Sequence, residues 1–317
     1  MKKNKNFLLM EGLLAIVALG LALLLLNSQT SSVQGKISVI LPDSDSSRWA
    51  ALKYGLKMAA KDQQVELAIV DTGESLTAKE QQRLINQESE GGADGIIFQP
   101  VSGIQVTELA KVKKQTPLLV LGNPLAKKED TKIPQVAPDN YVLGKSLGIA
   151  MLQDYADKLA GKTLGILMTE KDIPLVTTRL EGLEDTLKKT GIRTLWQVSL
   201  KQTTNVEEVL EKQDKVDLLV ALDDESLQKL TSKARTPVAY GIGHSTETLY
   251  GLDVGIIAAE VVPDLFQMGY QSVVSMTEEW RPLFGTVKKQ EVSFQVIRRE
   301  ELFSEEHQEL LFTMSQN

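Results

Sequence analysis

The chain has 317 residues, a formal net charge of −7 at pH 7, 42% hydrophobic residues, two histidines and no cysteine. This hydrophobic fraction is typical of a folded chain of about two domains, and the negative charge argues against a nucleic-acid partner. The lack of cysteine excludes disulfides, cysteine zinc sites and thiol nucleophiles, and two histidines offer little for metal or acid–base chemistry. We therefore expect a binding protein with no cofactor and no metal.

The first 35 residues differ in composition from the rest. Lys2, Lys3 and Lys5 precede an apolar run over 7–26, and a helix of about 20 residues spans the roughly 30 Å hydrocarbon layer of a bilayer. Lysines place that end in the cytoplasm. The segment predicts a single-pass anchor in the cell membrane, with the remaining chain on the extracytoplasmic side. A cleaved signal peptide is the alternative, although residues 27–30 lack an Ala-x-Ala pattern.

Strand and helix patterns alternate from residue 36 onward. Short continuous apolar runs are typical of parallel strands, and apolar residues spaced three or four apart are typical of a helix face. The expected order is strand 36–41, helix 50–61, strand 66–70, helix 77–90, strand 95–98, helix 106–115 and strand 117–121. This alternation predicts a parallel sheet with helices on both faces.

The pattern restarts after Pro134 and Pro138. The expected order is helix 139–159, strand 163–168, helix 178–189, strand 193–199, helix 206–213, strand 216–222, helix 225–232, strand 237–241, strand 255–257 and helix 263–277. The fold class is therefore α/β, with two similar doubly wound parallel-sheet lobes and a ligand cleft between them.

Candidate ligand-binding residues follow the strands, because open parallel sheets bind ligands at the carboxyl ends of their strands. If the two lobes face each other, these loops line one cleft. The candidates are Ser46, Arg48 and Trp49 after the first strand, Asn123 after the fourth, Asp223 after the strand ending at Leu222, and His244 after the strand containing Tyr240.

Each candidate has a structural alternative. Trp49 has a flat face suited to a sugar ring, or it packs the first helix onto its sheet. Asp223 accepts hydrogen bonds from a ligand, or caps the helix that follows it. Asn123 contacts a ligand or serves the turn before a proline, and Arg48 and His244 contact a ligand or only solvent. No catalytic residue is assigned.

Several segments, in order, resemble the type I periplasmic solute-binding proteins of the ribose- and galactose-binding group, whose fold is shared by LacI-type effector domains. They are the loop 47–49 leading into a helix with Gly55, the segment 92–100 (similar to "GvDaiiinP"), Asp139-Asn140, the Arg-x-x-Gly motif at Arg179, and Asp223-Asp224. The resemblance implies two lobes joined by three crossings, ligand-driven closure and no catalysis.

The resemblance also implies a division of the chain. Residues 1–35 precede the resembling segments and are assigned, from their composition, to the cytoplasmic lysines, the anchor and a linker. The N-terminal lobe comprises 36–138 and about 264–290, and the C-terminal lobe comprises 139–263 and about 291–300. We expect a C-terminal helical tail over 301–317, which packs on a lobe or contacts a partner.

The chain departs from the resembled family at the sugar-clamping positions. Gly122-Asn123 stands where the family has an Asp-Arg pair, Gly243 replaces an aspartate, and Pro263 replaces a glutamine. Thr177 stands at the place of an arginine expected in the loop before the Arg-x-x-Gly helix, and is therefore a further candidate. Arg179 itself is expected to form an ion pair within its lobe.

These features together predict an extracytoplasmic solute-binding protein that closes on a small polar ligand, a carbohydrate or related molecule. The expected partner is the membrane permease of an ABC importer. One alternative is the ligand-sensing subunit of a membrane histidine kinase. An α/β enzyme is a third possibility, for which Asp223-Asp224 is the only candidate pair.

Overall fold

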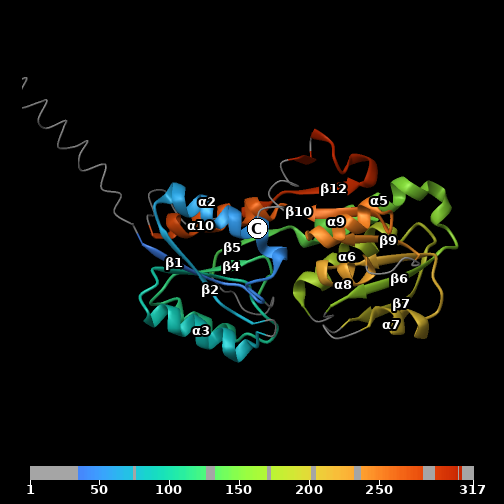
Figure 1. Cartoon of the computed structure of the whole chain (residues 1–317). Helices are drawn as coiled ribbons and strands as arrows, with labels where there is room; N and C mark the ends of the chain where they lie inside the picture. Colours follow the sequence, from blue (N-terminus) through green and yellow to red (C-terminus); the bar gives the residue numbers. More distant parts are fainter. Residues whose placement is uncertain are drawn as a thin grey trace, which may run out of the picture.

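The computed structural model describes residues 35–73, 76–125, 133–169, 173–200, 205–231, 237–280, 290–305 and 307–308. These residues form two α/β lobes, each built on a six-stranded sheet. In Figure 1 the first lobe holds the blue and teal elements, and the second holds the green α5 with most of the yellow and orange elements. The predicted fold class of two parallel-sheet lobes is confirmed.

The sheet of the first lobe has the strand order β11-β5-β4-β3-β1-β2, and every pair in it is parallel. Its strands are β1 (Lys36–Ile40), β2 (Glu66–Val70), β3 (Gly95–Phe98), β4 (Leu118–Leu121), β5 (Gln135–Pro138) and β11 (Gln290–Val292). Its helices are η1 (Ser47–Trp49), α2 (Ala50–Gln63), α3 (Ala78–Glu90), α4 (Val106–Val112) and α10 (Leu265–Trp280).

The sheet of the second lobe has the equivalent order β12-β10-β9-β8-β6-β7, with β12 antiparallel to β10. Its strands are β6 (Thr163–Met168), β7 (Arg193–Ser199), β8 (Leu218–Ala221), β9 (Val238–Ile242), β10 (Ile257–Pro263) and β12 (Phe294–Arg298). Its helices are α5 (Asn140–Tyr155), η2 (Ala156–Leu159), α6 (Pro174–Leu187), α7 (Val206–Lys212), α8 (Asp224–Thr231), α9 (Thr246–Asp253) and η3 (Arg299–Glu301).

The chain passes between the sheets three times: from β5 to α5, from β10 to α10, and from β11 to β12. In each sheet the order reverses between two central strands, β1 and β3 in the first and β6 and β8 in the second. Ligands of open α/β sheets bind outside the strand ends at such reversals. The topology therefore directs attention to the loops after β1, β3, β6 and β8.

Three strands and one helix were not predicted from the sequence, and one helix begins earlier than predicted. β5 occupies the proline-flanked segment that was interpreted as a boundary, and β11, β12 and α9 were missed. α6 begins at Pro174 rather than at residue 178, because proline is favoured in the first turn of a helix, where its missing N–H costs nothing.

Glycines allow one close helix crossing in each lobe. A Cβ atom at Gly55 of α2 would overlap the backbone oxygen of Phe266 on α10, and one at Gly182 of α6 would overlap that of Tyr141 on α5. Gly269 and Gly144 play the reciprocal role on the partner helices. The two lobes thus repeat the same backbone-to-backbone contact.

We expect Gly182→Ala to lower the free energy of unfolding by about 1–3 kcal/mol, because the added methyl group must push α5 and α6 apart. Urea denaturation followed by circular dichroism measures this change. Gly73→Ala is the control, since a Cβ there meets no atom within 4 Å. Equal stability of the two variants would contradict the close crossing.

Two predicted segments fall wholly or largely outside the described residues. The proposed anchor over 7–26 is one, and most of the tail over 301–317 is the other. In the part of the chain that the structure describes, no helix combines the length and apolarity needed to cross a membrane.

Candidate functional site

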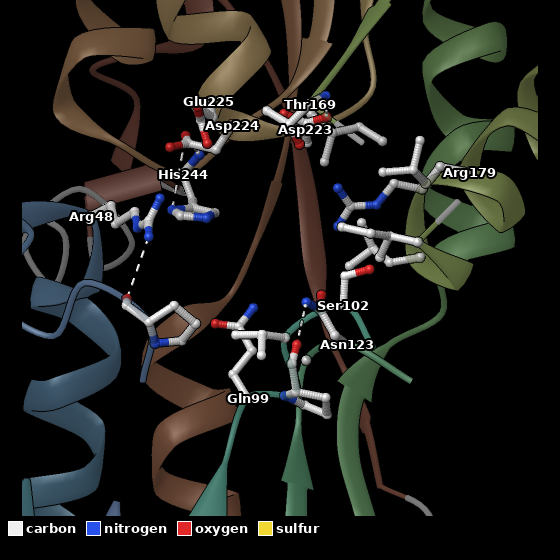
Figure 2. Close-up of a pocket in the computed structure, with 18 of the residues that line it drawn as sticks. Arg48, Gln99, Ser102, Asn123, Thr169, Arg179, Asp223, Asp224, Glu225 and His244 are labelled. Atoms are coloured by element: carbon white, nitrogen blue, oxygen red, sulfur yellow. Dashed lines mark hydrogen bonds and ion pairs between the residues drawn. The ribbon is translucent and has the colours of Figure 1, made fainter. Parts of the chain in front are cut away.

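A cavity of about 940 Å³ lies between the lobes, where the carboxyl ends of the two sheets face each other (Figure 2). The first lobe contributes residues that follow β1, β3 and β4, and the second contributes residues that follow β6, β8 and β9. The polar and aromatic lining comprises Arg48, Trp49, Thr77, Gln99, Ser102 and Asn123 from the first lobe, and Thr169, Arg179, Ser199, Asp223, Asp224, Glu225 and His244 from the second.

Five of the seven predicted residues line this cavity: Arg48, Trp49, Asn123, Asp223 and His244. Asn123 also donates from Nδ2 to the backbone oxygen of Pro100 at 3.3 Å, so it serves its turn as well. The expectation that ligand-binding residues follow parallel strands therefore identified residues that line one cavity although they are up to about 200 positions apart in sequence.

Ser46 and Thr177 do not line the cavity. Ser46 closes a turn, its backbone N–H donating to the oxygen of Asp43 at 3.0 Å. Thr177 is exposed on α6, where its Oγ1 donates to the oxygen of Ile173 at 3.3 Å. The reason is the early start of α6, which turns a residue expected in a loop into one on the outer face of a helix.

Arg179 lines the cavity, and the expected ion pair within its lobe is absent. Its side chain is 7% exposed, Nε donates to Oδ1 of Asn140 at 2.9 Å, and Nη1 donates to the oxygen of Leu222 at 2.8 Å. Burial lowers the pKa of Arg179 to about 10, and the charges of Asp223 and Asp224 oppose that shift. Among the described residues no carboxylate lies within 4.0 Å of its guanidinium.

Gln99 is a second lining residue that was not predicted from the sequence. It follows β3, its backbone oxygen accepts from Nε2 of Gln81 at 2.7 Å, and its own Oε1 is buried without a protein partner. Its position after a strand of the predicted sheet was the available signal, but the segment was interpreted only as part of a family motif.

The lobes touch at one end of the cavity through Trp49 and His244. Their rings stack with centroids 5.9 Å apart and an interplanar angle of 27°. Arg48 lies over the Trp49 ring at 5.0 Å, and Nε1 of Trp49 donates to the oxygen of Pro42 at 3.0 Å. Trp49 is thus held by its own loop and contacts the opposite lobe.

The carboxylates of the cavity wall hold loops of the second lobe. Asp223 accepts from the backbone N–H of Ser226 at 2.9 Å and from that of Thr169 at 2.8 Å. Burial raises the pKa of Asp223, and these hydrogen bonds oppose the shift. Asp224 accepts from the N–H groups of His244 at 2.7 Å and Ser245 at 3.0 Å. Asp223 therefore caps the start of α8, which was the structural alternative to a role in binding.

Asp223→Ala is expected to lower the free energy of unfolding by about 1–3 kcal/mol, because it removes a helix cap and leaves the half-buried N–H of Thr169 without its partner. Chemical denaturation tests this. The exposed Asp45→Ala serves as the control. An unchanged stability of Asp223→Ala would show that the two hydrogen bonds contribute little.

His244 lines the cavity, and burial and nearby charges shift the pKa of its imidazole. Burial lowers its pKa, the charge of Asp224 opposes that shift, and the charges of Arg48 and Arg179 lower it further. Its Nδ1, like Nε of Arg48 and Oε1 of Gln99, is buried without a protein hydrogen-bond partner. Buried polar groups are normally paired, so three such atoms around one cavity are typical of a binding site.

Within the described residues, no group of three or more histidine, aspartate or glutamate side chains is arranged to hold a metal ion. The site combines guanidinium, amide, hydroxyl, carboxylate, imidazole and aromatic groups, a set suited to hydrogen bonds and ring contacts with a polar organic molecule.

Comparisons with known proteins agree with this architecture. A family model described as a periplasmic binding protein domain matches residues 37–281. No curated protein matches the chain. Among solved structures, a glucose-galactose binding protein, GanP, from Geobacillus stearothermophilus is 22% identical over 85% of this chain and 99% of its own, with a TM-score of 0.74.

Two further structures are similar in fold. A carbohydrate transporter solute-binding protein from Agrobacterium radiobacter, in complex with D-arabinose, has a TM-score of 0.76 at 15% identity, over 87% of this chain and 98% of its own. A chain of the XylFII–LytSN complex has a TM-score of 0.72 at 17% identity, over 85% of this chain and 99% of its own. The chain therefore belongs to the periplasmic binding protein family, whose members bind ligands.

Proposed function

We propose that this protein binds a small saccharide-like ligand in the cavity between its lobes, and that a membrane partner recognises the ligand-bound protein. The observation that carries the proposal is the cavity itself, lined from both lobes by buried polar atoms that have no protein partner. The sugar ligands named for structures of similar fold support it.

Closure of the lobes is the proposed mechanism. A ligand that contacts both lobes binds the closed state more tightly than the open one, and this difference in affinity shifts the population toward closure. The three chain crossings are positioned to act as the hinge. The contact between Trp49 and His244 lies on the closing faces and involves both lobes.

Thermal unfolding of the purified full-length chain tests ligand binding. The panel contains D-galactose, D-glucose, D-arabinose, D-fucose and their acid derivatives, with nucleosides and amino acids as other classes. A ligand at 100 times its Kd stabilises the fold by about 2.7 kcal/mol, which raises the melting temperature by several degrees. A panel in which no saccharide raises it would contradict the proposal.

The ligand-bound protein has two candidate roles. The first is delivery of the ligand to the permease of an ABC importer. Sensing through a membrane histidine kinase is the second, and its specific support is the similarity in fold to XylFII in its complex with LytSN. Co-purification of the full-length protein with solubilised membrane proteins, with and without ligand, separates them: a permease or a kinase is recovered.

We also propose that residues 7–26 hold the protein at the membrane with its lobes outside the cytoplasm, on the strength of their apolar sequence and the preceding lysines. Membranes from expressing cells test this by alkaline carbonate extraction. An anchored chain stays in the pellet, whereas a chain cleaved after the apolar run appears in the supernatant.

A further inference from the structure

The acidic side chains of the cavity wall already have partners. Both oxygens of Asp223 accept backbone hydrogen bonds, and Oδ1 of Asp224 accepts two more. Glu225 is paired with Lys229, with 3.7 Å between Oε1 and Nζ. Little carboxylate capacity is therefore left for the hydroxyl groups of a ligand.

The guanidinium of Arg179, in contrast to these carboxylates, still has a nitrogen available for a ligand. It is nine-tenths buried and lines the cavity, while Nε and Nη1 are fixed by two neutral oxygens. Its Nη2 makes no hydrogen bond to any described residue, and no described carboxylate is in contact with the group. A buried cation whose direct partners are neutral favours an anionic ligand, because the cost of its desolvation is only partly offset by the more distant charges of Asp223 and Asp224.

Arg48 adds a second positive charge from the first lobe. Its ion pair with Asp43 is long, at 3.9 Å, and its Nε is buried without a partner. Figure 2 shows Arg48 and Arg179 facing the cavity from opposite sides. Both arginines also depress the pKa of His244, and among nearby charges only that of Asp224 opposes them. The charges of both arginines therefore act at His244 within the cavity, where the charge of Asp224 opposes them.

We propose that the ligand of this cavity carries an anionic oxygen group, a carboxylate or a phosphate. This group accepts a hydrogen bond from Nη2 of Arg179 and is attracted by the charge of Arg48 when the lobes close. The inference rests on the proposed function and specifies its ligand as an acidic saccharide rather than a neutral one. Guanidinium groups bind both kinds of anion through charge-assisted hydrogen bonds.

Matched pairs of ligands test the inference by isothermal titration calorimetry on the full-length protein. Each neutral sugar is compared with its acid: D-galactose with D-galacturonate, and D-glucose with D-glucuronate. The 6-phosphates of both sugars distinguish phosphate from carboxylate. We expect at least one anionic form to bind about 10-fold or more tightly than its neutral parent, an advantage that shrinks as salt is added.

The variant Arg48→Gln tests whether the charge of Arg48 causes the tighter binding of the anionic ligand. It should reduce the advantage of the anionic ligand over its neutral parent several-fold, while the control Arg193→Gln, at an exposed position of β7, should leave the advantage unchanged. Equal loss of affinity for the neutral and the anionic ligand would overturn the role of the Arg48 charge.

His244 gives an independent readout, because the chain has only two histidines. In an NMR titration, a bound anion should raise the pKa of His244, whereas a neutral ligand that only removes water should lower it. Neutral sugars that bind as tightly as their acids would overturn the inference and leave the proposed function standing. No binding by these six ligands or by any other saccharide of the thermal-unfolding panel, neutral or acidic, would overturn both.

Discussion

Arg179→Met should weaken ligand binding by about 100-fold or more. A hydrogen bond between a ligand and a charged group contributes about 1.5–3 kcal/mol, whereas the loss of the donors to Oδ1 of Asn140 and the oxygen of Leu222 lowers the stability of the fold. A total of about 2.7 kcal/mol corresponds to 100-fold in Kd. Calorimetric titration of the tightest-binding saccharide of the panel measures the change.

The matched control is Arg193→Met in the same lobe, where the side chain is exposed and the affinity should not change. Because Arg179 also supports its lobe, urea denaturation of both variants must accompany the titration. A variant that is less stable but binds the ligand with the affinity of the wild type would show that Arg179 has only a structural role.

Glu260→Gln should change the pH dependence of stability more than any other single substitution on β10. Glu260 is 0% exposed, its Oε1 lies 2.6 Å from Oγ1 of Thr248, and its Oε2 has no protein partner. Burial raises the pKa of Glu260 from 4.5 to about 8; the charge of Asp224 adds to this shift, and the hydrogen bond from Thr248 opposes it. The folded protein therefore keeps a proton on this carboxyl group near pH 7.

The sign of the effect is set by linkage. Because the folded state binds this proton more tightly than the unfolded state does, the stability from this group is complete below the unfolded pKa. It is lost as the pH rises from 4.5 toward 8. The loss is at most about 1.4 kcal/mol per pH unit. Glutamine carries no proton to lose, so the variant should gain on the wild type progressively across this range.

Urea unfolding at pH 5, 6, 7 and 8 measures this difference. The exposed Glu211→Gln, on α7 of the same lobe, should keep the profile of the wild type. Parallel profiles for Glu260→Gln and the wild type would mean that the carboxyl group ionises without penalty and that its burial does not govern its protonation.

The two-lobe fold was predictable because its central strands are continuous apolar runs between amphipathic helices, a pattern that local sequence carries by itself. β5, β11 and β12 were not predictable in this way. β5 is four residues long and ends in a proline, and β11 is three residues long and pairs with a strand about 150 positions earlier. Such strands form because of tertiary pairing, not because of local propensity.

The site was predictable as far as it consists of loops after strands, which correctly placed Arg48, Trp49, Asn123, Asp223 and His244 around one cavity. Arg179 was predicted to have a structural role, in an ion pair within its lobe, and not to line the cavity.

The start of α6 explains two outcomes together. A helix from Pro174 turns Val176, Arg179 and Leu183 inward and leaves Thr177 outside. A shift of four residues in one helix boundary therefore places Arg179 in the cavity lining and Thr177 outside it.

The fluorescence of Trp49 tests most directly whether a saccharide binds between the lobes. The chain has three tryptophans, so a variant with Trp196→Phe and Trp280→Phe reports on Trp49 alone. A ligand that closes the lobes should change this emission saturably, with the Kd found by calorimetry, because Trp49 lines the cavity and stacks on His244 of the opposite lobe. A saccharide that binds the folded variant yet leaves the emission of Trp49 unchanged would contradict binding between the lobes.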